Sequence, residues 1–215
     1  IPVNLAGYDQ KEQLMLFETV HLSQYAIGYN EVSFKDIQDH WAKNQIEFLA
    51  AREIVKGKAA GVFEPDANVT RAEFVTMLAN TMTDAAITGS KSAGFDDVLA
   101  GAWYEDYVNW AVAMGIVNGY GNGKFGPNDL ITREQMSVML DKFISASQKR
   151  LEVVNDKSSF KDQNNISDWA CAAVTGMQQA GIINGRPDGT FDPKGNATRA
   201  EAATVIKGYI EAGLK

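Results

Sequence analysis

The chain of 215 residues is poor in cysteine and histidine, and each shortage excludes a class of chemistry. A single cysteine, Cys171, cannot form an internal disulfide, and one thiol does not assign the chain to a redox compartment. The two histidines lie far apart in sequence, and neither has a serine or cysteine nucleophile motif around it. The stretch 188–196 lacks the register and the distal glutamate of a calcium loop. We therefore expect no metal, no cofactor and no nucleophilic catalysis.

Long apolar runs and basic clusters are also missing. No apolar run approaches the roughly 18 residues that a membrane-spanning helix needs. The net charge is −7 and no run of basic residues occurs, whereas non-specific nucleic-acid binding needs a basic face to displace counterions. We expect neither a membrane span nor a nucleic-acid partner. Because the chain begins at Ile1 and shows no signal peptide, we expect a processed or excised piece of a longer protein.

What the sequence does contain is one unit that occurs three times. In every copy a Phe follows the aligned Trp by 22 residues, and an Arg follows that Phe by 8 residues. This agreement predicts repeats at 33–83, 94–147 and 159–213 within one composite domain, with an extension at 1–32. The recurring positions are Phe34, Phe95 and Phe160; Asp36, Asp97 and Asp162; Trp41, Trp103 and Trp169; Gly57, Gly119 and Gly185; Phe63, Phe125 and Phe191; and Arg71, Arg133 and Arg199.

Each repeat is predicted to form a helix, a tight loop and a second helix. The first helix begins near the Trp, and we expect the recurring Gly to end it as a left-handed C-cap. The Phe that closes the loop is expected in the core. Apolar stripes at 74–82, 136–144 and 202–210 predict three innermost helices around a pseudo-threefold axis. The fold class is therefore mainly all-α, with one more helix expected over residues 9–29.

The second helix of each repeat begins with a capping box that is followed by a misplaced cation. In "NVTRAEF", Thr70 is the expected N-cap, and Glu73 the residue that reaches back to it. Arg71 then occupies the first helical position, where the positive end of the helix dipole disfavours a cation. One interpretation is that the Arg extends into solvent or pairs with the Asp of the Phe-x-Asp element. The other is that a bound carboxylate or phosphate resolves the conflict.

The order Phe-x-Asp, Trp, Gly-Ile-Val-Asn-Gly, Phe-x-Pro and Thr-Arg-Ala-Glu resembles the S-layer homology (SLH) motif. Three tandem copies cover 33–213, about the size of a complete SLH module. The resemblance implies a spindle-like domain around a three-helix bundle, secreted and attached without covalent bonds to the bacterial cell wall or S-layer. It also implies binding of secondary cell wall polymer, typically through pyruvylated N-acetylmannosamine, in grooves between repeats.

The resemblance assigns candidate ligand-binding residues by position. The Arg would hold the ligand carboxylate, the Asp of Phe-x-Asp would contribute to the site, and the Gly would offer backbone contacts. The Trp fits either the groove wall or the core, and we favour the core for a Trp that opens an amphipathic helix. Copy two has "TREQ" for "TRAE", and the loops after the Gly differ, so we expect unequal grooves. The candidates are Arg71, Arg133, Arg199, Asp36, Asp97, Asp162, Gly57, Gly119, Gly185, Trp41, Trp103 and Trp169.

Two function classes remain open. The first is a carbohydrate-binding anchor for the cell surface. The second is a structural or assembly module of a surface protein, which would meet other surface-layer subunits and bind no glycan. A glycosidase is disfavoured because each repeat is short and no acid/base pair of carboxylates stands out.

Overall fold

The computed structural model describes residues 6–9, 11–19, 28, 30–82, 87, 90–156 and 159–214. Helices dominate these residues, together with one small antiparallel sheet of two strands, which confirms the mainly all-α fold class. None of the helices described is long and apolar enough to cross a membrane. The helices are α1 (Lys43–Ala50), α2 (Arg71–Ala79), α3 (Glu105–Ala113), α4 (Arg133–Ala146), α5 (Asp168–Gln179) and α6 (Arg199–Gly213), with short 3-10 helices at Lys35–Ile37 and Gln163–Asn165, and the strands are β1 (Ala6–Asp9) and β2 (Leu14–Phe17).

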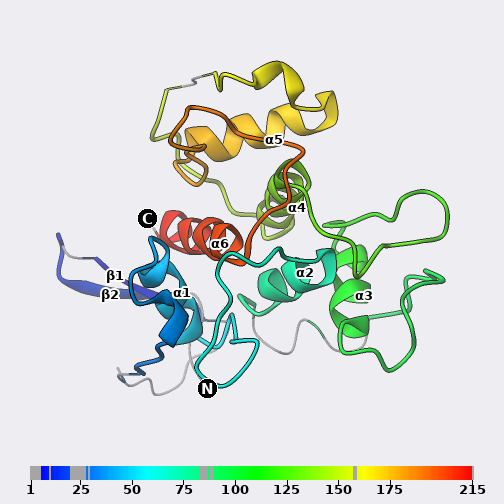
Figure 1. Ribbon diagram of the computed structural model, residues 1–215, viewed down its shortest axis with the longest axis horizontal. Helices are drawn as coiled ribbons and strands as arrows, with labels where there is room; N and C mark the ends of the chain where they lie inside the picture. The colour runs from blue at the N-terminus through cyan, green and yellow to red at the C-terminus, as the bar shows by residue number, and fades with distance from the viewer. Residues whose placement is uncertain are drawn as a thin grey trace.

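The second helix of each repeat lies at the centre of the molecule. In Figure 1, α2, α4 and α6 meet in the middle, while α1, α3 and α5 lie outside them. Leu78, Leu140 and Ile206 are fully buried in one shared core, which confirms the predicted inner helices. Each inner helix also packs against the outer helix of the next repeat: α2 with α3, α4 with α5, and α6 with α1. The third repeat therefore meets the first, and the arrangement is cyclic.

Backbone hydrogen bonds close this cycle just before the inner helices. The N–H of Ile131 donates to Val69 O (3.0 Å), that of Ala197 to Ile131 O (2.9 Å), and that of Val69 to Ala197 O (3.0 Å). The three residues are fully buried, so each bond satisfies backbone groups that water cannot reach. Extended segments of the three repeats thus form a closed ring of backbone hydrogen bonds next to the N-termini of the inner helices.

All three predicted capping boxes are present. The side chains of Thr70, Thr132 and Thr198 accept from the backbone N–H three residues on, and the side chain there accepts from the N–H of the Thr. The first turn of each inner helix is fixed in this way, and with it the position of the Arg that follows the Thr.

The outer helices end earlier than predicted. They stop at Ala50, Ala113 and Gln179, so the expectation that the recurring Gly forms their C-cap is wrong. The chain turns instead four residues before that Gly, at left-handed positions held by Gly115 (φ 70°) and Gly181 (φ 74°). In the first repeat the same position is Glu53, with φ 59°.

Lack of space explains the recurring Gly. A Cβ built on Gly119 would lie 2.4 Å from Cε1 of Phe95 and 2.5 Å from the carbonyl O of Lys124. The corresponding contacts recur at Gly57 and at Gly185. The glycine therefore lets the loop pass directly over the Phe of Phe-x-Asp.

The N-terminal extension differs from the prediction. The expected helix over 9–29 is wrong for residues 14–17, which form β2 and pair antiparallel with β1. Two of the residues that suggested a helical face, Leu14 and Phe17, are instead the first and last residues of β2, and a left-handed Gln13 (φ 55°) leads into that strand. Residues 10, 20–27 and 29 of the expected helix lie outside the described residues. The hairpin is joined to the repeats by a hydrogen bond from Nη2 of Arg52 to Ala6 O (2.9 Å).

Candidate functional site

The three recurring arginines each begin an inner helix and reach across to the next repeat. They are 4%, 7% and 6% exposed at Arg71, Arg133 and Arg199. In each, Nε donates to the carbonyl of the loop Phe of the following repeat. The bonds are Arg71 to Phe125 (3.0 Å), Arg133 to Phe191 (2.6 Å) and Arg199 to Phe63 (2.9 Å). The arginines therefore lie at the three junctions between repeats.

This geometry excludes the interpretation that the Arg at the first helical position extends into solvent or pairs with the Asp of Phe-x-Asp. The guanidinium groups do not extend into solvent, and none lies within 4.0 Å of a Phe-x-Asp carboxylate among the described residues. Each lies over the ring of the same loop Phe, with Cζ between 4.3 and 5.1 Å from the ring centroid. Burial lowers the pKa of all three groups, but a guanidinium stays charged at any ordinary pH.

The Phe-x-Asp carboxylates hold the loop that forms the other side of each junction. Asp97 accepts from the backbone N–H of Phe125 and Gly126, both at 2.8 Å. Asp36 and Asp162 accept from the corresponding pairs in their own repeats. Burial alone would raise the pKa of Asp36 and Asp97, but the N–H donors outweigh it and the pKa of each is lowered. These three carboxylates therefore act on the loop that carries the carbonyl acceptor of the Arg.

The recurring tryptophans lie on the surface. Trp41, Trp103 and Trp169 are 60%, 59% and 57% exposed, so the favoured assignment of these residues to the core is wrong. The core aromatic of the outer helices is Trp110, with the loop Phe residues nearby in the same cluster. Trp41 and Trp103 precede α1 and α3 by two residues, and Trp169 is the second residue of α5.

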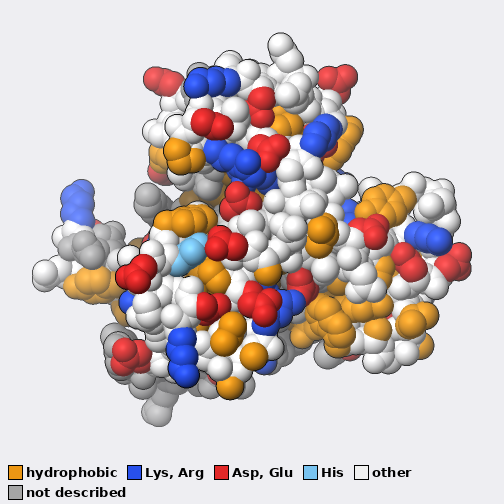
Figure 2. Space-filling view, in the orientation of Figure 1, with side chains coloured by type: hydrophobic (Ala, Val, Ile, Leu, Met, Phe, Trp, Pro, Cys, Tyr) orange, Lys and Arg blue, Asp and Glu red, His pale blue; other side chains and the backbone are white. Residues whose placement is uncertain are grey.

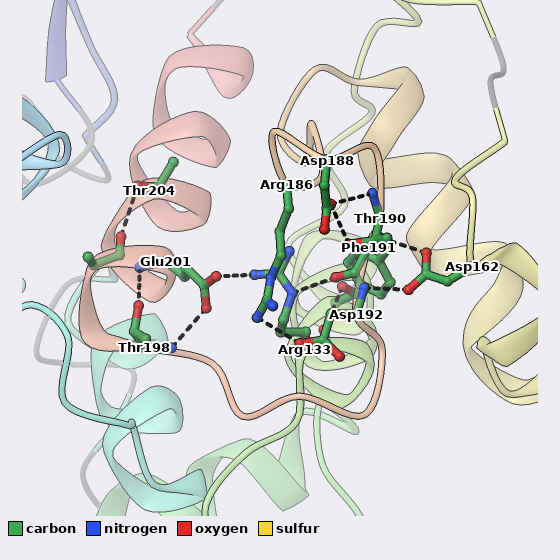
Figure 3. A network of polar contacts seen from close by, with 12 residues as sticks. Arg133, Asp162, Arg186, Asp188, Thr190, Phe191, Asp192, Thr198, Glu201 and Thr204 are labelled. Carbon is green, nitrogen blue, oxygen red and sulfur yellow. Dashed lines mark hydrogen bonds and ion pairs between the residues drawn. The ribbon is translucent and has the colours of Figure 1, made fainter.

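A cavity of about 530 Å³ marks the junction of the second and third repeats. Figure 3 shows Arg133 between Glu201 of α6 and the loop that carries Phe191. Trp41, from the first repeat, contributes to the wall of the same cavity. All three repeats thus supply residues to one groove: the Arg from the second, the loop from the third and the Trp from the first. Gly185, one of the sequence-predicted site residues, also lines it.

The side chains that surround the arginines were not indicated by the repeat pattern. Arg133 Nη1 lies 2.5 Å from Oε1 of Glu201, the capping-box residue of the next inner helix. The position after the recurring Gly is Lys58, Tyr120 or Arg186, and it faces the same junctions. Lys58 pairs with Glu73, Arg186 with Asp192 (2.7 Å), and Tyr120 donates to Asp129 (3.1 Å). Only the loop differences between the copies could have indicated this variation.

Charges of both signs are mixed over the visible surface. In Figure 2, Lys and Arg side chains lie scattered among Asp and Glu on this face. Because the net charge is −7, an anionic partner must be recognised by local cationic sites. The junction arginines are cations of this kind.

The family comparison agrees with this geometry. The sequence model described as "S-layer homology domain" matches residues 33–75, 94–137 and 159–203. The chain belongs to the S-layer homology family. Each SLH match begins at the Phe-x-Asp element and ends within an inner helix, so each includes one Arg and the loop that meets an Arg of a neighbouring repeat.

Three relatives show the contexts in which such modules occur. An amylopullulanase of Thermoanaerobacterium thermosulfurigenes is 40% identical over 94% of this chain and 11% of its own length. The exoglucanase XynX of Acetivibrio thermocellus is 42% identical over 84% of this chain and 16% of its own. The S-layer protein sap of Bacillus anthracis is 32% identical over 81% and 21%. The chain therefore spans about a fifth or less of each of these relatives.

SLH membership gives the chain its general role. The SLH module is non-catalytic and has a role in cell-surface anchoring, which it performs by binding cell wall polymers. The chain is accordingly a secreted, wall-associated part of a cell-surface protein.

Proposed function

We propose that this SLH module anchors the protein to which it belongs by binding a secondary cell wall polymer in the grooves between repeats, with pyruvylated N-acetylmannosamine as the recognised residue. The observation that carries the proposal is the buried arginine at each junction, placed at a helix N-terminus, together with the exposed Trp41, which lines the same cavity as Arg133. The pyruvate ketal supplies a carboxylate, and a guanidinium at a helix N-terminus binds carboxylates well. The sugar ring supplies an apolar face that can stack on an aromatic side chain.

The candidate residues divide into direct contacts and supports. Arg71, Arg133 and Arg199 would bind the carboxylate through the Nη atoms, because Nε is already committed to a backbone carbonyl. Trp41, Trp103 and Trp169 would form the stacking wall. Asp36, Asp97 and Asp162 would contribute through the loop that they hold, and Gly57, Gly119 and Gly185 by letting that loop approach closely. We propose no metal, cofactor or catalytic residue for this chain.

One observation favours the second candidate function, a structural module that binds no glycan. Each Arg already has an architectural role, since it bonds to the backbone of the next repeat and lies over a Phe ring. If that role were its whole purpose, the grooves would serve only assembly with other surface-layer subunits.

Co-sedimentation with cell wall sacculi separates the two functions. A glycan anchor should sediment with sacculi that carry the wall polymer and stay in solution after the polymer is removed. Arg→Lys variants at the three junctions keep the charge but lose the planar fork, so binding should fall while the helical fold is retained. Sedimentation that is independent of the polymer would support the assembly module instead. Circular dichroism of each variant is the control for folding.

A further inference from the structure

A second cavity, of about 260 Å³, lies between α4 and α5, and none of the junction arginines lines it. Figure 1 shows these two helices side by side, and they pack against each other. Ile144 of α4, Met177 of α5 and Leu151 of the segment between the two helices contribute its apolar lining. That segment is fixed to the end of α5, because the N–H of Val154 donates to Gln179 O (2.9 Å). Three packed elements therefore form the cavity.

The cavity lies where one position of the repeat carries no side chain. Seven residues after the aligned Trp, the outer helices have Phe48 in α1, Trp110 in α3 and Gly176 in α5. A Cβ built on Gly176 would meet no atom within 4 Å, so close packing does not require glycine there. Glycine inside a helix lowers stability relative to alanine. The third repeat thus keeps a destabilising residue in the middle of a helix, and open space is the result.

The inner helices differ at the position that faces this one. Eight residues after the junction Arg, the inner helices carry Ala79, Asp141 or Lys207. Nζ of Lys207 lies 5.3 Å from the centroid of the Phe48 ring, and Asp141 lines the cavity together with Gly176. The junction of the third and first repeats therefore holds a ring and a cation. The corresponding places between α4 and α5 hold neither group, and a carboxylate takes the place of the cation.

Asp141 is a carboxylate without a partner. Within the part of the chain that the structure describes, its side chain makes no hydrogen bond and no ion pair, and partial burial raises its pKa. The other charged groups of the cavity do not neutralise it. Lys149 is paired with Glu18, which follows β2, and Glu152 adds a second negative charge at the exposed rim. A partly desolvated, unpaired carboxylate is best satisfied by a cation that can donate hydrogen bonds.

We propose that this cavity binds a protonated amine carried on an aromatic ring, with the ring in the space beside Gly176 and the ammonium group at Asp141. The ring would take the place that Phe48 has in the first repeat, and the ammonium would supply the positive charge that Lys207 supplies in α6. A volume of about 260 Å³ lies just below the range of pockets for drug-sized ligands, which favours a single ring with a short chain. The glycan binding proposed for the junction arginines does not enter this inference.

Titration of the full chain with phenethylamine, followed through the NMR shifts of the Gly176 and Leu151 amides, tests the proposal. Phenethyl alcohol has the same ring and no charge, so it isolates the contribution of the ammonium group. A blocked dipeptide of phenylalanine and lysine is the third probe. It distinguishes a polypeptide segment from a free amine as the source of the group, according to which of the two charged probes binds more tightly.

Three variants separate the cavity from general effects. Asp141→Asn removes the carboxylate, and Asp106→Asn makes the same change of net charge at an exposed position of α3, outside the cavity. Gly176→Phe fills the cavity with the residue that the first repeat carries at this position. The melting temperature of each variant is the control for folding.

We expect Asp141→Asn to weaken phenethylamine binding about tenfold, as the loss of one charge-assisted contact does. Phenethyl alcohol should bind the wild type more weakly by a similar factor. Gly176→Phe should abolish binding, and Asp106→Asn should leave it unchanged. An absence of shifts in the wild type, or equal affinity of the wild type and Asp141→Asn, would overturn the proposal. Full binding by a folded Gly176→Phe would overturn it as well, and if that variant does not fold, Asp141→Asn decides.

Discussion

At one backbone position the three repeats differ in how well the residue suits its left-handed conformation. The residue that follows each outer helix is left-handed, and two repeats use glycine there, Gly115 and Gly181. The first repeat has Glu53 in the same conformation. A residue with a Cβ is disfavoured in this region by about 1–2 kcal/mol, although glycine loses more entropy on folding.

Glu53→Gly should therefore stabilise the fold by about 0.5–1 kcal/mol, which is the relief of strain less the added entropy of the unfolded chain. Denaturant unfolding of the variant against the wild type measures the difference. Gly181→Glu is the reciprocal control and should destabilise. An unchanged unfolding midpoint for Glu53→Gly would show that the left-handed conformation carries no strain at this site.

The loop carboxylates should make stability depend on acid pH. The pKa of Asp36 and of Asp97 is lowered in the folded state by backbone N–H donors, which outweigh the opposing effect of burial. Their stabilising contribution is then complete above the unfolded pKa of about 3.9 and is lost as pH falls through the lower folded value. Asp36→Asn and Asp97→Asn should lower the melting temperature at pH 7, and the difference from wild type should shrink near about pH 2.

Asp96→Asn provides the matched control for this prediction. Asp96 precedes Asp97, and its side chain accepts no hydrogen bond from the backbone of the described residues. Its substitution should leave both melting temperatures unchanged. Equal melting of Asp97→Asn and wild type at pH 7 would contradict the role of the carboxylate in holding the loop.

At the scale of the element, the capping boxes define the helices on which the site depends. Thr198 starts α6, and its side chain accepts from the Glu201 N–H at 3.2 Å. Thr198→Ala should cost about 1 kcal/mol of stability, the usual loss for an N-cap, measured by thermal or denaturant unfolding. Thr204→Ala, the same change inside α6, is the control. Because Thr204 bonds back to Ala200 O and alanine is the better helix former, its replacement should be neutral or slightly stabilising.

The sequence predicted the individual helices better than the contacts that form between the repeats. Periodic stripes and capping boxes fixed the inner helices and their starts, because both depend on residues within four positions of each other. The exposed tryptophans and the Glu201 partner of Arg133 were not predicted, since they follow from how repeats meet. The preference of a Trp for the core is an average over proteins, and here the space is filled by Trp110 and the loop Phe residues. The N-terminal strands were missed because a short apolar run fits either a helix or a strand.

At the scale of the whole molecule, the repeats should fold as one unit. Removal of 159–214 takes away α6, the Phe191 carbonyl that Arg133 bonds, and one member of the ring formed by Val69, Ile131 and Ala197. The remaining two repeats should show no cooperative thermal transition, whereas the whole chain should show a single one. Removal of residues 1–30, which contribute the hairpin, is the control and should leave that transition in place. A cooperative transition in the two-repeat fragment would contradict this view.

The closed cycle also decides how the protein responds to force. Arg199 bonds the carbonyl of Phe63, 136 positions earlier in the chain, and α6 packs against α1. In an open array of repeats, a pull on one end peels the last unit from a single neighbour. Here the last repeat is held by the first as well as by the second, so tension on the chain is shared between two contacts from the start. Among the three repeats that the structure describes, none is therefore a terminal unit held by a single neighbour, from which forced unfolding could begin.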